Sequence, residues 1–99
     1  MRKQLPKLTE KQFQTQIVQL AKMHGWWVYH TFDARKSEPG FPDLVLIRAP
    51  EILFWELKTE TGRMSKPQDE VLQMLVDCGM TAEVKRPRDW DSIEQALRR

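Results

Sequence analysis

The part of the sequence that most constrains the fold is a pair of apolar segments, residues 44–47 and 52–58, with Pro50 between them. Gly40 and Pro42 precede the first segment and a polar stretch over residues 59–62 follows the second, so each segment is bounded as a short strand would be. Pro50 suits a two-residue hairpin turn poorly, because such turns need a positive φ. We therefore predict an antiparallel hairpin whose loop has four residues, 48–51.

This hairpin brings three charged side chains together. Successive side chains on a strand point to opposite faces, so Glu56 and Lys58 share one face while Trp55 and Leu57 occupy the other. Opposite residues of an antiparallel pair lie on the same side of the sheet, and an even loop length sets Asp43 across from Glu56. Two carboxylates and an ammonium group are thus expected at one place.

Such a group has a chemical use. Two carboxylates a few ångströms apart repel each other unless a proton or a cation lies between them. Oxygen ligands suit Mg²⁺ or Mn²⁺ better than zinc, and such an ion can lower the pKa of a bound water and neutralise charge on a phosphate oxygen. The pattern indicates a hydrolytic site for a phosphodiester. The residue types alone fit equally well with a surface hairpin whose ion pairs are solvated and contribute roughly 0–1 kcal/mol each.

The spacing of these residues also resembles a known family. Pro42-Asp43 followed by Glu56-Leu57-Lys58 is similar to the PD-(D/E)XK signature of restriction-endonuclease-like nucleases. With Gly40 before it and the segment 65–68 opening a helix after it, the chain more narrowly resembles the VRR-NUC domain, over roughly residues 9–86. That family occurs as small stand-alone phage proteins and as the nuclease domain of Fanconi-associated nuclease.

The resemblance implies roles for the hairpin residues. Asp43, Glu56 and the backbone carbonyl of Leu57 would bind Mg²⁺ or Mn²⁺. Lys58 would orient the attacking water or stabilise the charge of the pentacovalent phosphorus. These assignments are implied by the family pattern and add to the chemistry expected from the residue types.

Two further residues are open to two interpretations. Glu10 lies in the first turn of a helix predicted to follow Thr9, where an acid interacts favourably with the helix dipole; resemblance to archaeal Holliday-junction resolvases implies instead that it joins the metal site. Gln68 fits a capping box with Ser65, and the VRR-NUC resemblance implies that it lies beside the site lysine and helps catalysis. The same resemblance points to Gln14 as a neighbour of the site.

The remaining patterns predict a helix over residues 9–24, a strand over 26–32, a helix over 65–78, a strand over 80–85 and a short helix over 91–97. The order is helix, three strands, helix, strand, helix. This order matches the αβββαβ core of restriction-endonuclease-like folds, an α/β class with a mixed central sheet flanked by helices, here with a short C-terminal helix. We expect a single domain over residues 1–99, with a basic arm at 1–8.

Composition sets the class of protein. Of the 99 residues, 40% are hydrophobic and 30% are charged, as in globular domains. No apolar run approaches the roughly 20 residues that span a bilayer, so we expect no membrane association.

With no evident signal peptide and a single cysteine, Cys78, the expected compartment is a reducing cytoplasm. The resemblance implies a phage-infected or lysogenic bacterial host. Cys78 lies in the last turn of a helix with an apolar stripe, so we expect its side chain to be a buried packing residue.

A net charge of +2 is too small to establish nucleic-acid binding. Basic residues gather in several groups along the sequence, which supports DNA binding but is also common on a solvated surface. Contacts with the DNA backbone would position the substrate without reading its sequence. His30 could contact a phosphate or act as a general base, or it could be a hydrogen-bonded strand residue. The basic residues expected to bind DNA are Lys11, Arg35, Lys36, Arg63 and Lys66.

The leading hypothesis is a metal-dependent DNA endonuclease. Resemblance to the small family members implies a homodimer that acts on branched DNA such as a Holliday junction, with Met23, Trp26 and Trp27 as candidate interface residues. One alternative is a non-catalytic DNA-binding module that retains the nuclease fold. Another is a small structural protein in which the acidic hairpin is incidental.

Overall fold

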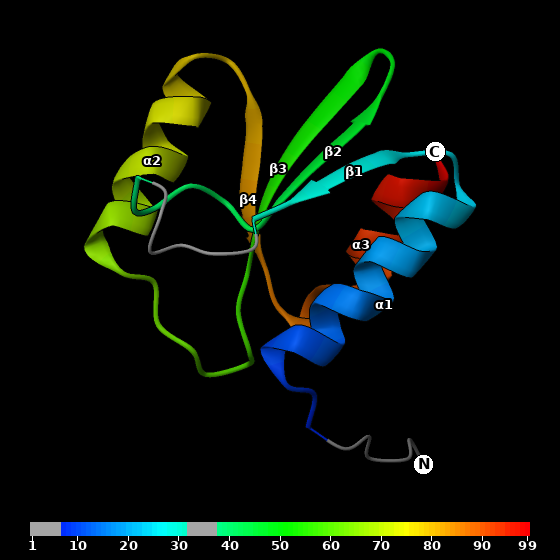
Figure 1. The fold of residues 1–99 in the computed structure, drawn as a ribbon, viewed down its shortest axis with the longest axis horizontal. Coiled ribbons are helices and arrows are strands. Elements are labelled where there is room, and N and C mark those ends of the chain that lie inside the picture. The colour runs from blue at the N-terminus through cyan, green and yellow to red at the C-terminus, as the bar shows by residue number, and fades with distance from the viewer. Residues whose placement is uncertain (1–6, 32–37) are drawn as a thin grey trace.

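A computed structural model describes residues 7–31 and 38–99 of the chain. The order of its elements confirms the predicted αβββαβ core and the short C-terminal helix (Figure 1). The elements are α1 (Glu10–Met23), β1 (Trp27–His30), β2 (Leu44–Arg48), β3 (Glu51–Leu57), α2 (Lys66–Asp77), β4 (Thr81–Lys85), the one-turn 3₁₀ helix η2 (Pro87–Asp89) and α3 (Trp90–Arg98).

The four strands form one mixed sheet in the order β1-β2-β3-β4. β1 pairs with β2 and β2 pairs with β3 in antiparallel orientation, whereas β4 runs parallel to β3. A parallel neighbour cannot be reached through a tight turn, and α2 provides the crossover between β3 and β4. The predicted mixed sheet is confirmed.

The central hairpin has the predicted register but a shorter loop. Leu44 pairs with Trp55 and Arg48 pairs with Glu51, which sets Asp43 and Glu56 opposite each other at the next position. The prediction of a four-residue loop over 48–51 was wrong, because only residues 49 and 50 form the turn. The Ala49–Pro50 peptide bond is cis and neither residue has a positive φ, a type VI arrangement that accommodates proline.

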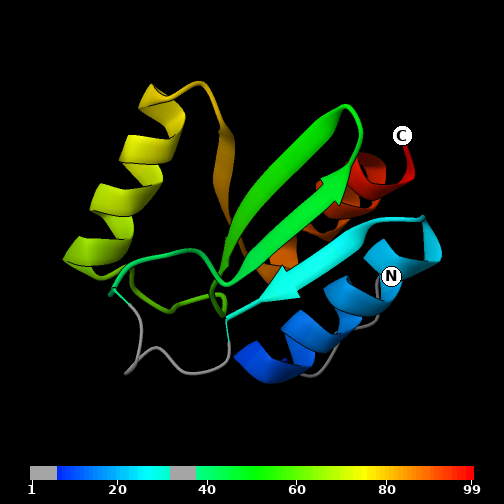
Figure 2. The same cartoon turned by 45° about the horizontal axis from the view of Figure 1, so that its top comes forward.

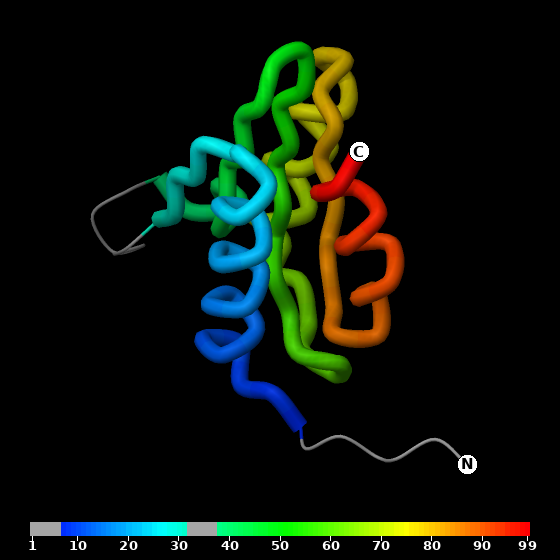
Figure 3. Tube along the Cα trace, turned by 90° about the vertical axis from the view of Figure 1, so that its right-hand side faces the viewer, coloured from blue at the N-terminus to red at the C-terminus, as the bar shows by residue number. Residues whose placement is uncertain are grey.

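One face of the sheet carries the core. Leu44 and Leu46 of β2 and three residues of β3 are buried against α1 and α3. Figure 2 shows these two helices on one side of the sheet, and in Figure 3 both face the viewer. Each fully buried aliphatic or aromatic side chain contributes roughly 1.5–3 kcal/mol. The other members of this core are Leu53, Trp55, Leu57, Phe13, Ile17, Ala21, Trp26, Ile93 and Leu97.

The opposite face of the sheet is covered much less. Helix α2 lies beside β4, apart from the other two helices (Figure 2), and no residue within Lys66–Asp77 is buried. Large apolar side chains on β1, β2 and β3 therefore remain exposed on this face. They are Trp27, Tyr29, Ile47 and Ile52.

The two neighbouring tryptophans differ in their environments. Trp26 is only 4% exposed, its indole N–H donates a hydrogen bond to the carbonyl oxygen of Leu97 (2.9 Å), and the guanidinium of Arg48 lies 4.4 Å from the centre of its ring. Trp26 is thus part of the core, and its proposed place in a dimer interface was wrong. Trp27, which is 60% exposed, and Met23, which is 79% exposed, are both accessible.

Two expectations about the environment have different outcomes. No helix in residues 7–31 or 38–99 has the length and hydropathy needed to cross a membrane. The prediction that Cys78 packs in the interior was wrong, because its side chain is exposed at the end of α2. Helix α2 contacts the sheet mainly through β4, so its apolar stripe is not covered along its whole length.

Candidate active site

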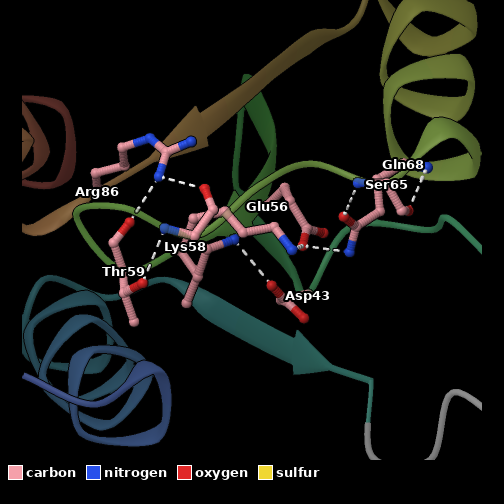
Figure 4. A network of polar contacts seen from close by, with 9 residues as sticks. Asp43, Glu56, Lys58, Thr59, Ser65, Gln68 and Arg86 are labelled. Atoms are coloured by element: carbon pink, nitrogen blue, oxygen red, sulfur yellow. Dashed lines mark hydrogen bonds and ion pairs between the residues drawn. The ribbon is translucent and has the colours of Figure 1, made fainter.

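Glu56 is the central residue of a polar group at the end of the sheet where β2 begins and β3 ends. Its side chain is 2% exposed. Oε2 accepts a hydrogen bond of 2.9 Å from Nε2 of Gln68 and lies 3.7 Å from Nζ of Lys58 (Figure 4). Oε1 is buried and has no hydrogen-bond partner among the described residues. A buried polar atom without a partner is rare and calls for a ligand.

Asp43 is held at the same end of the sheet by backbone contacts. Its Oδ2 accepts a hydrogen bond of 2.8 Å from the backbone N–H of Leu57 (Figure 4). The backbone N–H of Thr31 donates to the carbonyl oxygen of Asp43 at 3.1 Å, which continues the pairing of β1 with β2. The hairpin therefore places the carboxylates of Asp43 and Glu56 together, as predicted from the register.

Gly40 allows the chain to approach this site from α2. Its φ is +102°, a left-handed conformation that favours glycine. A side chain here would also collide with the carbonyl oxygen of Pro67 in the first turn of α2. The segment leading to Asp43 and the beginning of α2 are consequently packed backbone to backbone.

The electrostatics of the site oppose ionisation of Glu56 and Glu10. Burial raises the pKa of Glu56 to about 8. Asp43 raises it further through its charge and because its carboxylate can accept a hydrogen bond from Glu56 once Glu56 is protonated; the charge of Glu10 also raises it, and Lys58 lowers it. The pKa of Glu10 is also raised, first by desolvation and then by the charge of Asp43, while Lys58 lowers it. Glu10, at the start of α1, thus interacts electrostatically with the site.

The side chains available as metal ligands are few. Within residues 7–31 and 38–99, no three Asp, Glu, His or Cys side chains converge closely enough to bind one ion. Asp43 and Glu56 supply two carboxylates, and the backbone carbonyl of Leu57 is a further oxygen at the same end of β3. An unpaired carboxylate oxygen and a raised pKa fit the binding of a hard divalent cation, because such a cation would replace the proton on Glu56.

Gln68 completes the capping box of α2 and also contacts the site, through Glu56 and not through Lys58 as the resemblance implied. Its Oε1 accepts a hydrogen bond of 2.9 Å from the backbone N–H of Ser65, and Oγ of Ser65 accepts one of 3.2 Å from the backbone N–H of Gln68, which completes the capping box of α2. Its Nε2 is then free to donate to Glu56. The contact is with the acid, whose other neighbour is the ammonium group of Lys58.

The other residues singled out in the sequence have different locations. Lys11 and Arg63 are exposed, and Lys66 is exposed with its ammonium 3.9 Å from Glu70. Gln14 is half-buried on α1. His30 pairs with Leu44, so its side chain is on the core face and not beside Asp43 and Glu56. Arg35 and Lys36 lie outside the described residues.

Sequence reasoning missed Arg86, which follows β4 directly. Its Nη1 donates to the carbonyl oxygens of Thr59 (2.6 Å) and Gly62 (2.8 Å), in the loop after Lys58 (Figure 4). A single arginine among many basic residues gives no local signal of such a contact. Only the pairing of β3 with β4 brings the two segments together.

Comparison with known proteins gives a family and two similar structures. The family model of the VRR-NUC domain matches residues 2–89. A solved "VRR_NUC domain protein" is 22% identical, with a TM-score of 0.76, and the match covers 93% of this chain and 87% of that one. Hjc, a Holliday junction resolvase from the archaeal hyperthermophile Archaeoglobus fulgidus, is 23% identical with a TM-score of 0.52, over 76% of this chain and 65% of Hjc. No curated protein sequence gives a significant match.

Proposed function

Because the chain belongs to the VRR-NUC domain family, we propose that it is a metal-dependent endonuclease that hydrolyses phosphodiester bonds in DNA. The observation that carries this proposal is the state of Glu56. A buried carboxyl with an unpaired oxygen, opposite Asp43 and 3.7 Å from an ammonium group, is costly for stability and suits a cation site next to a phosphate.

The residues of the site have distinct proposed roles. Asp43, Glu56 and the carbonyl of Leu57 hold the metal ion, with Glu10 as the nearby additional carboxylate. A bound Mg²⁺ or Mn²⁺ would lower the pKa of a water molecule and neutralise charge on a phosphate oxygen. Lys58 holds the attacking water or the phosphate oxygen, and help of this kind is worth about 3–4 kcal/mol of transition-state stabilisation.

DNA contacts are proposed for the basic side chains that surround the site. The side chains of Lys11, Arg63 and Lys66 are exposed on α1, on the loop after β3 and at the start of α2. Each could reach a backbone phosphate, which would fix the position of the duplex without selecting a sequence. Arg35 and Lys36 precede Asp43 in the chain and are assigned the same role from the sequence.

We propose that the active form is a homodimer and that its substrate is branched DNA. So small a domain has little surface with which to hold two strands, and the similar protein Hjc is a Holliday junction resolvase. The apolar side chains exposed on the α2 side of the sheet would be covered by the second copy, since a contiguous apolar patch is unusual on a monomer. Trp27, one of the interface residues proposed from the sequence, lies on this face with Tyr29, Ile47 and Ile52.

A cleavage panel tests the proposal. Labelled single strand, duplex, flap, four-way junction and supercoiled circle are incubated with Mg²⁺, Mn²⁺ or EDTA. Cutting of the junction with metal and none with EDTA is expected. Asp43→Asn should abolish cutting while circular dichroism shows an intact fold, and Asp91→Asn, which changes an exposed acid on α3, should cut as the native chain does.

The panel also separates the alternatives. A DNA-binding module without catalysis would shift the junction in a gel and leave it uncut under every metal condition. A structural protein with an incidental acidic hairpin would not bind DNA even at low salt, where phosphate contacts are strongest. Unchanged cutting by Asp43→Asn in saturating metal would reject the site assignment.

A further inference from the structure

The loop that follows Lys58 has little regular structure to fix it. Strand β3 ends at Leu57, and the next element, α2, begins at Lys66. The backbone N–H of Lys58 donates to the carbonyl oxygen of Lys85 at 3.1 Å, which is the last contact of this strand with the sheet. Beyond that point the position of the loop depends on hydrogen bonds made by its own residues.

Arg86 provides three hydrogen bonds to this loop. Its Nη1 lies 2.6 Å from the carbonyl oxygen of Thr59 and 2.8 Å from that of Gly62 (Figure 4). It also lies 3.4 Å from the carbonyl oxygen of Glu60. One guanidinium nitrogen therefore binds three backbone carbonyl groups of the loop. Hydrogen bonds with a charged donor are stronger than neutral ones.

Arg86 is itself held in place. Its backbone N–H donates to Oδ2 of Asp89 at 2.8 Å, and the backbone N–H of Arg88 donates to Oε1 of Glu60 at 3.0 Å. The segment after β4 and the loop after β3 thus form one connected unit, which we call the arginine clamp: Arg86 with the loop residues Thr59, Glu60 and Gly62.

The clamped loop folds back onto the lysine of the site. The backbone N–H of Gly62 donates to Oγ1 of Thr59 at 3.1 Å. A Cβ added to Gly62 would be 3.6 Å from Cδ of Lys58, so Gly62 faces the alkyl chain of that lysine with room for about one methyl group between them. The side chain of Lys58 is 13% exposed, and the ammonium group at the end of its alkyl chain lies 3.7 Å from Oε2 of Glu56.

We propose that Arg86 is a positioning residue for catalysis: through the arginine clamp it fixes the loop that confines the side chain of Lys58. Among the described residues, Arg86 makes hydrogen bonds to Thr59, Glu60, Gly62 and Asp89 and none to the proposed metal ligands. The inference rests on the proposed nuclease function, because it assigns Lys58 a part in the chemical step. An interaction made in the transition state changes kcat, whereas uniform binding changes KM.

The matched pair Arg86→Ala and Arg88→Ala tests the clamp. Both remove one positive charge, from positions on either side of Pro87, but within the described residues Arg88 contacts the loop only through its backbone N–H. With the four-way junction and saturating Mg²⁺, Arg86→Ala should lower kcat at least tenfold with KM within twofold of the native value. Arg88→Ala should leave kcat within twofold. Equal kcat for both variants would overturn the proposal.

Two further measurements exclude a general loss of structure. Millimolar guanidinium ion should restore part of the kcat of Arg86→Ala and none of that of Lys58→Ala, because it can refill the space between the loop carbonyls. Arg86→Lys, which keeps the charge and the fold, should have a kcat between those of the native chain and Arg86→Ala. If guanidinium restores nothing and Arg86→Lys equals the native chain, Arg86 does not position Lys58.

Hydrogen exchange of the metal-free protein separates this inference from the function it rests on. Amides of residues 59–64 should exchange faster in Arg86→Ala than in Arg88→Ala, while those of β2 and β3 stay protected. This readout needs no cleavage. If the native chain cuts no DNA, the nuclease proposal fails, and unchanged exchange in the loop would independently overturn the clamp.

Discussion

Nε2 of Gln68 lies 2.9 Å from Oε2 of Glu56, and this hydrogen bond connects α2 to the buried acid of the candidate site. Ser65 sets the orientation of the Gln68 amide, because its backbone N–H donates a hydrogen bond to Oε1 of Gln68. The N-terminal cap of a helix thereby also orients a carboxylate on the neighbouring strand. Helix formation at α2 and the geometry of the site are therefore linked through one side chain.

Gln68→Ala should reduce both stability and activity. Loss of the capping box should lower the free energy of unfolding by about 1 kcal/mol, and loss of the bond to Glu56 should lower kcat about tenfold. Gln12→Ala is the matched control, since Gln12 holds the same position in the capping box of α1. It should cost similar stability in denaturant unfolding but leave kcat unchanged. Equal kcat losses in the two variants would assign the effect to stability alone.

Metal binding should release a proton. At pH 6–7 the metal-free protein keeps Glu56 protonated because its pKa is about 8, and a divalent ion needs the carboxylate form. We expect about one proton released per ion at pH 6.5, little release above pH 9, and up to tenfold weaker apparent binding for each pH unit below 8. Titration calorimetry in two buffers of different ionisation enthalpy measures this. A heat of binding that does not depend on the buffer at pH 6.5 would contradict it.

The same shift predicts how the stability of the metal-free protein depends on pH. A glutamate ionises near pH 4.5 in the unfolded chain and near pH 8 at Glu56 in the folded one. Between these values the folded state holds the extra proton, so the free energy of unfolding should fall as pH rises from about 4.5 to 8 and then level off. The total change is of the order of a few kcal/mol at about 1.4 kcal/mol per pH unit.

Glu56→Gln isolates this contribution. The variant keeps the shape of the side chain but cannot ionise, so it should be more stable than the native chain at pH 8–9, by about 1–3 kcal/mol, and inactive. Glu70→Gln, at an exposed site on α2, should keep the native pH dependence. Urea unfolding at several pH values without metal provides the comparison, and parallel curves for the native chain and Glu56→Gln would be inconsistent with a buried, protonated Glu56.

The dimer proposal predicts a difference between the two sides of the sheet. Ile47→Lys adds a charge to the apolar face beside α2 and should yield a monomer by light scattering at micromolar concentration. Met23→Lys adds the same charge to α1, which covers the other face, and should leave the dimer intact. A native chain of monomer mass, or dissociation by Met23→Lys alone, would exclude this interface.

The sequence was sufficient for the parts of the fold that short-range rules control. The alternation of side chains and the even spacing of the hairpin predicted that Asp43 and Glu56 meet. The capping boxes predicted where α1 and α2 begin, at Thr9 and Ser65. These features involve neighbours along the chain or across one turn, so their physics is visible in a few residues.

The features that could not be predicted depend on distant contacts. Trp26 is buried because α3, 71 residues later, supplies a carbonyl for its indole N–H, and nothing near Trp26 distinguishes it from Trp27. Arg86 contacts Thr59 from 27 residues away. Cys78 was expected inside because α2 has an apolar stripe, but a stripe does not reveal how much of it the sheet will cover.

The absence of any buried side chain within Lys66–Asp77 has a thermal consequence. This helix can detach without exposing the core formed by α1, α3 and the sheet, so its local opening costs less free energy than global unfolding. Each opening carries Gln68 away from Glu56. On warming, turnover should therefore decline several degrees below the temperature at which the core melts, and it should return in full on cooling.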